Sequence, residues 1–371
     1  MLSSQRKYTE ATQRWAGVGP YYAMFPTAFA DEVVNRYSTV GDTILDPFAG
    51  RGTAIFSASV HDRIGIGIEL NPVGWVYAQA KLHTASEDDV ASRLDWLGEV
   101  ASDYKEAADQ LPPFFHHCFS SGVRSFLLAA RERLDWRRKN VDRTAMALLL
   151  VNMHGKREAS LSNQMRQTKS MSPDYAIRWW QERKLSPPEI DPVQFMKKKL
   201  RWRYAHGIPR NTCSQVYLGN STRILPEIKR ILLKRRNRLP IKLLLTSPPY
   251  YGVTNYHYDQ WLRLWLLGHP PNALRVSGVD RGKFENRDRY KKLLTDVFSK
   301  SASLLQKDAI IYVRTDFRDF TQTTTESVLR EVFSRKRLVK QSQPVMQPTQ
   351  TDLFGHHGED RGEVDIILLP K

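Results

Sequence analysis

The residues best suited to chemistry are Thr246-Ser247-Pro248-Pro249-Tyr250, which follow a short apolar run. That run predicts a buried strand, and the two prolines predict that it ends in a rigid loop. Each proline fixes φ near about −65° and lacks an N–H, so the Ser247 hydroxyl and the Pro248 carbonyl are held stiffly. Two acceptors beside the Tyr250 ring suit a planar ring that carries an exocyclic amino group. The alternative is that the segment merely terminates a strand.

A glycine turn, Asp46-Pro47-Phe48-Ala49-Gly50-Arg51-Gly52-Thr53, lies between a predicted strand and a predicted helix. This arrangement cradles nucleotides. The next predicted strand ends in Glu69, about 20 residues after the turn, where a carboxylate suits hydrogen bonding to ribose hydroxyls. The turn lacks the third glycine of the dinucleotide pattern and opens with the carboxylate of Asp46. It therefore favours a cationic ligand, such as a sulfonium amino-acid nucleoside, over a pyrophosphate.

Strand and helix patterns alternate on both sides of a long helical stretch, which predicts an α/β fold with a doubly wound, mainly parallel sheet. From about residue 84 to 212 strand signals disappear and helical periodicity dominates. We expect three parts: residues 1–84 with the glycine turn, a mainly helical basic insertion at 85–212, and the rest of the sheet at 213–371.

Positive charge is concentrated in the predicted insertion. The 371 residues carry a formal net charge of +17, and between Arg131 and Arg210 there are 19 Lys or Arg against 8 Asp or Glu. Basic residues interleaved with aromatic ones indicate a nucleic-acid surface, although a solvated helical face has the same composition. The candidate contacts are Arg166, Lys169, Arg178, Lys197, Lys198, Lys199 and Arg201.

Other features of the chain argue against a membrane, secretion or a metal. No apolar run approaches the roughly 18 residues of a membrane span, and the first residues have no apolar segment after their charges. We therefore expect a cytoplasmic protein. The two cysteines, Cys118 and Cys213, are too few for a disulfide framework or a structural zinc site, so no metal is expected.

Together, the glycine turn and the Thr246-Ser247-Pro248-Pro249-Tyr250 segment resemble the cofactor loop and catalytic motif of the S-adenosylmethionine-dependent DNA amino methyltransferases. The resemblance covers both halves of the predicted sheet but not the insertion. It implies a Rossmann-like methyltransferase sheet that binds S-adenosylmethionine. The cofactor residues that it implies are Phe25, Pro26, Asp46, Pro47, Phe48, Gly50, Gly52, Thr53, Glu69, Asn220 and Thr246.

The resemblance also implies catalytic roles for Ser247, Pro248, Pro249 and Tyr250. Ser247 and the Pro248 carbonyl would accept hydrogen bonds from the target amine, and Tyr250 would stack on a base flipped out of double-stranded DNA. Asn220 departs from the family pattern, which has Asp there. Serine before the two prolines accompanies cytosine N4 more often than adenine N6 in this family. Cytosine C5 methylation is disfavoured, because neither cysteine follows a proline.

Several alternatives stay open from the sequence alone. They are adenine N6 methylation of DNA, methylation of structured RNA, and a DNA-binding protein whose methyltransferase fold has lost catalysis. The insertion is expected to carry target recognition, within a restriction-modification or phage-defence system that includes a cognate restriction endonuclease. The segment Gln350 to Phe354 resembles the peptide that docks on the replication sliding clamp, although a loop between strands explains it equally well.

Overall fold

The computed structural model describes residues 10–20, 25–234, 241–252, 256–273, 286–344 and 362–371. The chain divides into two compact units. The sheet unit comprises Tyr22–Ala78, Arg210–Asn255 and Val279–Lys371, and the helical unit comprises Met1–Tyr21, Gln79–Pro209 and Tyr256–Gly278.

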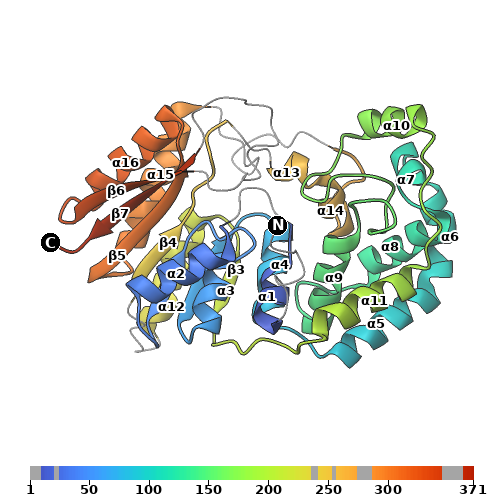
Figure 1. Cartoon of the computed structure of the whole chain (residues 1–371), viewed down its shortest axis with the longest axis horizontal. Helices are drawn as coiled ribbons and strands as arrows, with labels where there is room; N and C mark the ends of the chain where they lie inside the picture. Colours follow the sequence, from blue (N-terminus) through green and yellow to red (C-terminus); the bar gives the residue numbers. More distant parts are fainter. Residues whose placement is uncertain (1–9, 21–24, 235–240, 253–255, 274–285, 345–361) are drawn as a thin grey trace. The chain divides into compact units, whose positions relative to one another are not determined.

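The sheet unit contains a seven-stranded sheet in the order β3-β2-β1-β4-β5-β7-β6 (Figure 1). Neighbours from β3 to β5 pair in parallel, while β7 runs antiparallel to both β5 and β6. The predicted α/β fold with a doubly wound, mainly parallel sheet is confirmed. The strands are β1 (Thr43–Asp46), β2 (Ile64–Glu69), β3 (Gln215–Leu218), β4 (Ile241–Thr246), β5 (Leu305–Asp316), β6 (Arg337–Pro344) and β7 (Gly362–Leu369).

Helices cover both faces of this sheet, so apolar residues of its central strands are buried on both sides. Along β4, Leu244 packs into a cluster with residues of α12, α15 and α16, whereas Leu243 and Leu245 pack with residues of α2 and α3. In sheets covered in this way, ligands bind at the carboxyl ends of the parallel strands. The helices of this unit are α2 (Thr27–Tyr37), α3 (Thr53–Val60), α12 (Ser221–Lys234), α15 (Arg287–Ala302) and α16 (Asp319–Val332), and α4 (Pro72–Leu82) continues from it into the helical unit.

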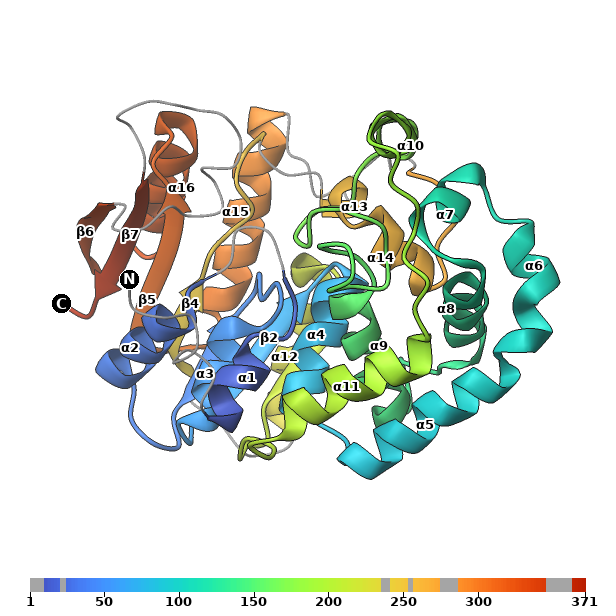
Figure 2. The same ribbon diagram turned by 45° about the vertical axis from the view of Figure 1, so that its right-hand side comes forward.

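The helical unit is built around α5, which packs against α8, α9 and α11 (Figure 2). Aromatic side chains fill its interior: Trp180 and Trp265 are fully buried, and the rings of Phe115 and Trp265 lie 4.6 Å apart. The elements are α1 (Ala11–Ala16), α5 (Glu87–Val100), the 3-10 helix η2 (Ala101–Tyr104), α6 (Lys105–Asp109), α7 (Pro113–Cys118), α8 (Ser121–Arg133), α9 (Asn140–Asn152), α10 (Pro173–Glu182), α11 (Pro192–Tyr204), α13 (Tyr256–Asp259) and α14 (Trp261–Leu266).

No strand forms between residues 85 and 212, all of which the structure describes, in agreement with the helical insertion. The compact helical unit is larger than this segment, because it also takes in Met1–Tyr21 and Tyr256–Gly278. Burial explains both additions: Trp15 of α1 and Trp265 of α14 are at most 1% exposed. Among the described helices, none is long and apolar enough to cross a membrane.

Candidate active site

Two short buried side chains join the predicted cofactor turn to the predicted catalytic loop. Asp46 ends β1 and Thr246 ends the neighbouring strand β4. The Thr246 hydroxyl donates to Asp46 Oδ1 at 2.6 Å, and the backbone N–H of Phe48 donates to the same oxygen at 3.0 Å. The hydrogen bond therefore fixes the two segments at adjacent strand ends.

Asp46 is only 2% exposed. Burial raises the pKa of Asp46 to about 7, against the lowering effect of the hydrogen bonds from Thr246 and Phe48. A buried carboxylate is stabilised by a positive charge beside it. The ionised form of Asp46 therefore favours a cationic group at this strand end.

The turn after β1 requires glycine at two positions. Gly50 has φ 54° and Gly52 has φ 74°, both in the left-handed region. A Cβ on Gly52 would lie 2.7 Å from the Cβ of Ala78, so no side chain fits there. Thr53 begins α3, and its hydroxyl accepts a hydrogen bond from Arg51 Nε at 3.1 Å.

Glu69, at the end of β2, holds this turn in place. Its Oε2 accepts from the backbone N–H of Gly50 at 2.7 Å, and its Oε1 accepts from that of Asn71 at 2.8 Å. The residue is 9% exposed. The predicted contact of Glu69 with ribose hydroxyls stays a prediction.

The segment after β3 contributes a neighbour of the glycine turn, Ser221. The Ser221 hydroxyl donates to the carbonyl of Pro47 at 2.5 Å. Asn220, the predicted cofactor residue, accepts with Oδ1 from the N–H and the hydroxyl of Thr222, at 2.9 and 2.8 Å. That oxygen caps the start of α12, as Asn does at helix N-termini.

The remaining predicted cofactor residues lie in apolar surroundings. Phe25 is 9% exposed and packs in the core cluster on the α2 and α3 face, with its ring 5.2 Å from that of Phe29. Pro26 directly precedes α2, and Phe48 packs, partly buried, against the opposite cluster.

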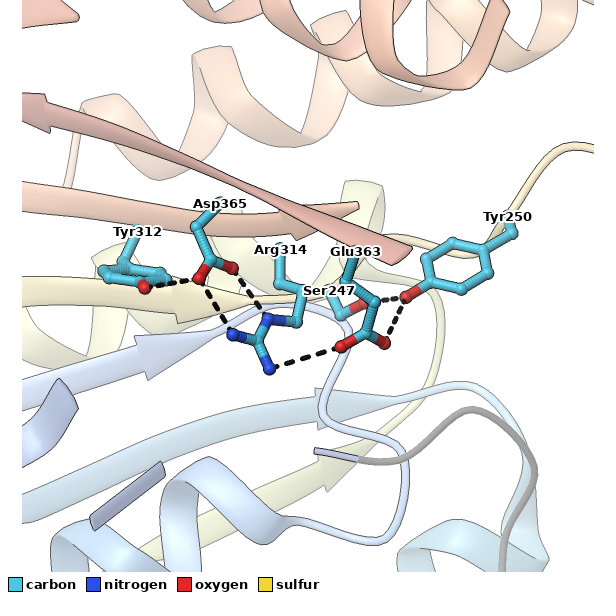
Figure 3. Close-up of polar contacts among 6 residues, drawn as sticks. All are labelled: Ser247, Tyr250, Tyr312, Arg314, Glu363 and Asp365. Atoms are coloured by element: carbon cyan, nitrogen blue, oxygen red, sulfur yellow. Dashed lines mark hydrogen bonds and ion pairs between the residues drawn. The ribbon is translucent and has the colours of Figure 1, made fainter. Parts of the chain in front are cut away.

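The predicted catalytic loop begins where β4 ends. Ser247 donates from Oγ to the hydroxyl oxygen of Tyr250 at 3.4 Å, and Tyr250 donates to Glu363 Oε1 at 3.3 Å (Figure 3). Tyr250 is 5% exposed, so most of its ring is covered in this structure. Pro248 is buried and Pro249 is half-buried. Stacking of the Tyr250 ring on a base stays a prediction.

Charged residues of β5 and β7 lie behind the catalytic loop. Arg314 Nη1 is 3.2 Å from Glu363 Oε2, while its Nε and Nη2 donate to the two oxygens of Asp365 at 2.7 and 2.8 Å (Figure 3). The Tyr312 hydroxyl donates to Asp365 Oδ2 at 2.8 Å. This network was not predicted from the sequence. Its signal was present, since charged residues inside otherwise apolar strands are rarely buried unless they are paired.

The predicted nucleic-acid residues of the helical unit differ in their surroundings. Lys169 is paired with Asp259 at 2.7 Å, and Lys197 with Asp95 at 2.8 Å. Lys199 is half-buried, and burial together with the neighbouring cations Lys198 and Arg203 lowers its pKa. The side chains that are exposed are Arg166, Arg178, Lys198 and Arg201.

Two further predictions concern a metal ion and the sliding clamp. Within it, no group of three His, Cys, Asp or Glu side chains is placed to hold a metal ion. The predicted clamp-docking segment, Gln350 to Phe354, lies outside the described residues.

Comparison with known proteins connects the first part of this site to a family. Residues 2–75 match the family model N6_N4_Mtase, described as DNA methylase. The matched segment contains the glycine turn and Glu69 and ends well before Ser247. The match therefore covers the glycine turn but not the Thr246-Ser247-Pro248-Pro249-Tyr250 segment.

Three type II methyltransferases are similar to this chain over short segments. M.MjaII of Methanocaldococcus jannaschii is 33% identical over 20% of this chain, M.MthZI of Methanothermobacter thermautotrophicus 43% over 13%, and M.Cfr9I of Citrobacter freundii 41% over 15%. The alignments cover 14%, 14% and 18% of these relatives, less than a fifth of their lengths. Among solved structures, the rRNA methyltransferase aviRa from Streptomyces viridochromogenes aligns with a TM-score of 0.35 and 12% identity, over 98% of this chain and 96% of that one.

Proposed function

We propose, from the match of residues 2–75 to the DNA methylase family, that this chain transfers a methyl group from S-adenosylmethionine to an exocyclic amino group in DNA. The observation that carries the proposal is the 2.6 Å hydrogen bond from Thr246 to Asp46. This bond links the glycine turn, which suits a cationic nucleoside, to β4, the strand that leads into Ser247 and Pro248. The methyl donor and the acceptor amine would therefore meet at one edge of the sheet.

The residues around the glycine turn fit the proposed cofactor. S-adenosylmethionine supplies a methyl group on a positively charged sulfur, which leaves as a neutral thioether. Asp46 offers a buried carboxylate to the positive end of such a ligand, and the left-handed Gly50 and Gly52 let the backbone approach it closely. Glu69 is placed at the end of the next strand, where a ribose would be hydrogen-bonded.

Ser247 and Pro248 would prepare the target amine. The lone pair of an exocyclic amine is delocalised into the base, which makes the nitrogen a poor nucleophile. Acceptors at the Ser247 hydroxyl and the Pro248 carbonyl favour a pyramidal nitrogen whose lone pair attacks the methyl carbon. The new N–C bond would form as the C–S bond breaks, its electron pair would stay on sulfur, and the nitrogen would then give one proton to solvent water.

The target base is proposed to be cytosine, modified at N4. Serine before the two prolines supports this choice over adenine N6. In a duplex the amino group is paired, so the base must leave the helix to reach the strand end. Recognition is assigned to the helical unit, whose basic residues are suited to phosphates.

Methyl transfer with isotopically labelled S-adenosylmethionine tests the proposal. We expect label in duplex DNA and none in a structured RNA of matched length. Label only in RNA would replace DNA by RNA as the substrate. If DNA is bound but no label is transferred, the chain is a DNA-binding protein that has lost catalysis.

The affinity for S-adenosylmethionine should depend on pH through Asp46. Because the pKa of Asp46 is about 7, most of this group is neutral at pH 6 and ionised at pH 8. A cationic ligand prefers the ionised form, so calorimetry should show about tenfold tighter binding at pH 8 than at pH 6. In Asp46→Asn the ligand's own titration remains, and the tenfold difference should disappear. An equal pH response in both proteins would remove Asp46 from the cofactor site.

The exposed basic residues of α11 should contribute to the salt dependence of DNA binding. Lys198 and Arg201 are the informative pair, because the neighbouring Lys197 is paired with Asp95. Replacing both by alanine should flatten the slope of log K against log salt by about 0.9 for each phosphate that is no longer neutralised. Lys307→Ala, at the exposed start of β5, is the matched control and should leave the slope unchanged. An unchanged slope in the double variant would assign these residues to a solvated face.

We further propose that the chain acts in the cytoplasm within a restriction-modification system, beside a cognate endonuclease. Support comes from the names of the three relatives, each a type II methyltransferase. DNA from cells expressing the chain should resist one endonuclease at its methylated sites. Docking on a sliding clamp through Gln350 to Phe354 stays a prediction from sequence.

A further inference from the structure

Ser247 and Tyr250 of the catalytic loop and Glu363 of β7 form a hydrogen-bond chain with a fixed direction. An ionised carboxylate can only accept, so the Tyr250 hydroxyl must give its single proton to Glu363 Oε1, 3.3 Å away. The oxygen of Tyr250 is then left to accept, and Ser247 donates to it at 3.4 Å. The Ser247 proton is therefore used in the bond to Tyr250, and the lone pairs of Ser247 Oγ remain to accept a hydrogen bond.

This direction matters because a serine hydroxyl is not an obligatory acceptor. A carboxylate before the two prolines would accept from an amine in any orientation, whereas a hydroxyl can turn and donate instead. A donating Ser247 would compete for the lone pair that the target amine needs for attack. A loop with serine at this position therefore requires something that holds the hydroxyl proton away.

Glu363 is held in place by its neighbours in the sheet. Arg314 of β5 lies 3.2 Å from Glu363 Oε2 and is itself anchored by Asp365, which is fully buried. The groups that face Glu363 are Arg314 and Asp316 of β5, Asp365 of β7 and Tyr250 of the loop. Burial raises the pKa of Glu363, Arg314 and the hydrogen bond of Tyr250 lower it, and the two aspartates raise it.

We propose that Glu363 is a positioning residue, which acts through Tyr250 to keep Ser247 as a hydrogen-bond acceptor toward the target amino group. This role rests on the proposed methyl transfer. Glu363 touches neither the base nor the cofactor in this scheme. Protonated Glu363 could donate a hydrogen bond to Tyr250. The Tyr250 and Ser247 hydroxyls would then no longer be restricted to one donor direction.

The test compares kcat and KM for Glu363→Gln and Tyr250→Phe, which keep the size of each side chain. Tyr250→Phe also keeps the ring for stacking and removes only the hydroxyl. Each variant should lower kcat by about tenfold while KM for cofactor and DNA changes less than about threefold. Because both residues act through the same hydrogen-bond chain, kcat of the double variant should be no lower than that of the worse single variant. Additive losses would contradict the coupling.

The pH profile at saturating cofactor separates this role from a merely structural one. In the wild type kcat should rise with pH through the pKa of Glu363 and then level off, and this limb should be absent in Glu363→Gln. Glu326→Gln is the matched control, since Glu326 pairs with Arg330 and Lys340 on α16 and β6 and should leave kcat unchanged. If the wild type transfers methyl groups and Glu363→Gln keeps its kcat and its acid limb, the positioning role is wrong. A wild type that transfers nothing would instead overturn the proposed function.

Discussion

Ser247→Ala is expected to lower the rate of methyl transfer by about 10²- to 10³-fold at saturating cofactor and DNA. The change removes the acceptor that the amine meets only as its nitrogen becomes pyramidal, so the loss belongs to the chemical step. Single-turnover rates with labelled cofactor measure this step directly. Binding of S-adenosylmethionine and of DNA should stay within about threefold of the wild type, because Ser247 holds neither.

Ser303→Ala provides the control for this substitution. Ser303 is exposed at the end of α15, where its hydroxyl donates to the carbonyl of Lys300 at 2.8 Å. Its removal should leave the rate of transfer unchanged. A Ser247→Ala protein that turns over as fast as the wild type would exclude Ser247 from catalysis, and the choice of cytosine would lose its main support.

Arg314→Met is expected to lower the free energy of unfolding by about 3–5 kcal/mol. The substitution leaves Asp365, which is fully buried, without the guanidinium that binds both of its oxygens. The guanidinium also stacks over Phe29, with its carbon 3.3 Å from the ring centroid. Unfolding by urea, followed through a signal of the sheet unit, measures the loss.

Two further variants distinguish the cost of leaving a buried charge unpaired from the cost of losing an ion pair. Arg330→Met removes an exposed pair with Glu326 on α16 and should cost less than about 1 kcal/mol. Arg314→Met combined with Asp365→Asn removes the uncompensated charge and should recover part of the loss. Equal stability of Arg314→Met and Arg330→Met would mean that the buried network contributes no more than a surface pair.

The sheet could be predicted from sequence because its strands carry their own signal. The apolar run that becomes β4 is buried on both faces, and the turn after β1 is marked by glycines whose backbone is left-handed in the structure. The meeting of Asp46 and Thr246 followed from a general rule about strand ends, since both residues end parallel strands. The hydrogen bond between them needed the structure, because it depends on the pairing of β1 with β4.

The ion network and the surface charges could not be predicted in the same way. Glu363 reaches Tyr250 only because β7 pairs with β5 in one register, which periodicity does not encode. Likewise, the sequence alone gives no partner for Lys197, whereas in the structure the packing of α5 on α11 brings Asp95 to it. Long-range pairings of this kind decide which charged residues remain available to a ligand.

Nucleoside analysis of duplex DNA incubated with the protein and S-adenosylmethionine tests whether the chain methylates cytosine N4 through Ser247. The DNA is digested to nucleosides, which are identified by mass spectrometry for the wild type and for Ser247→Ala. We predict N4-methylcytosine with the wild type and almost none with the variant. N6-methyladenine in its place would keep the reaction and correct the base. Unmodified DNA from a wild-type protein that binds both S-adenosylmethionine and DNA would show that the chain does not transfer methyl groups to DNA.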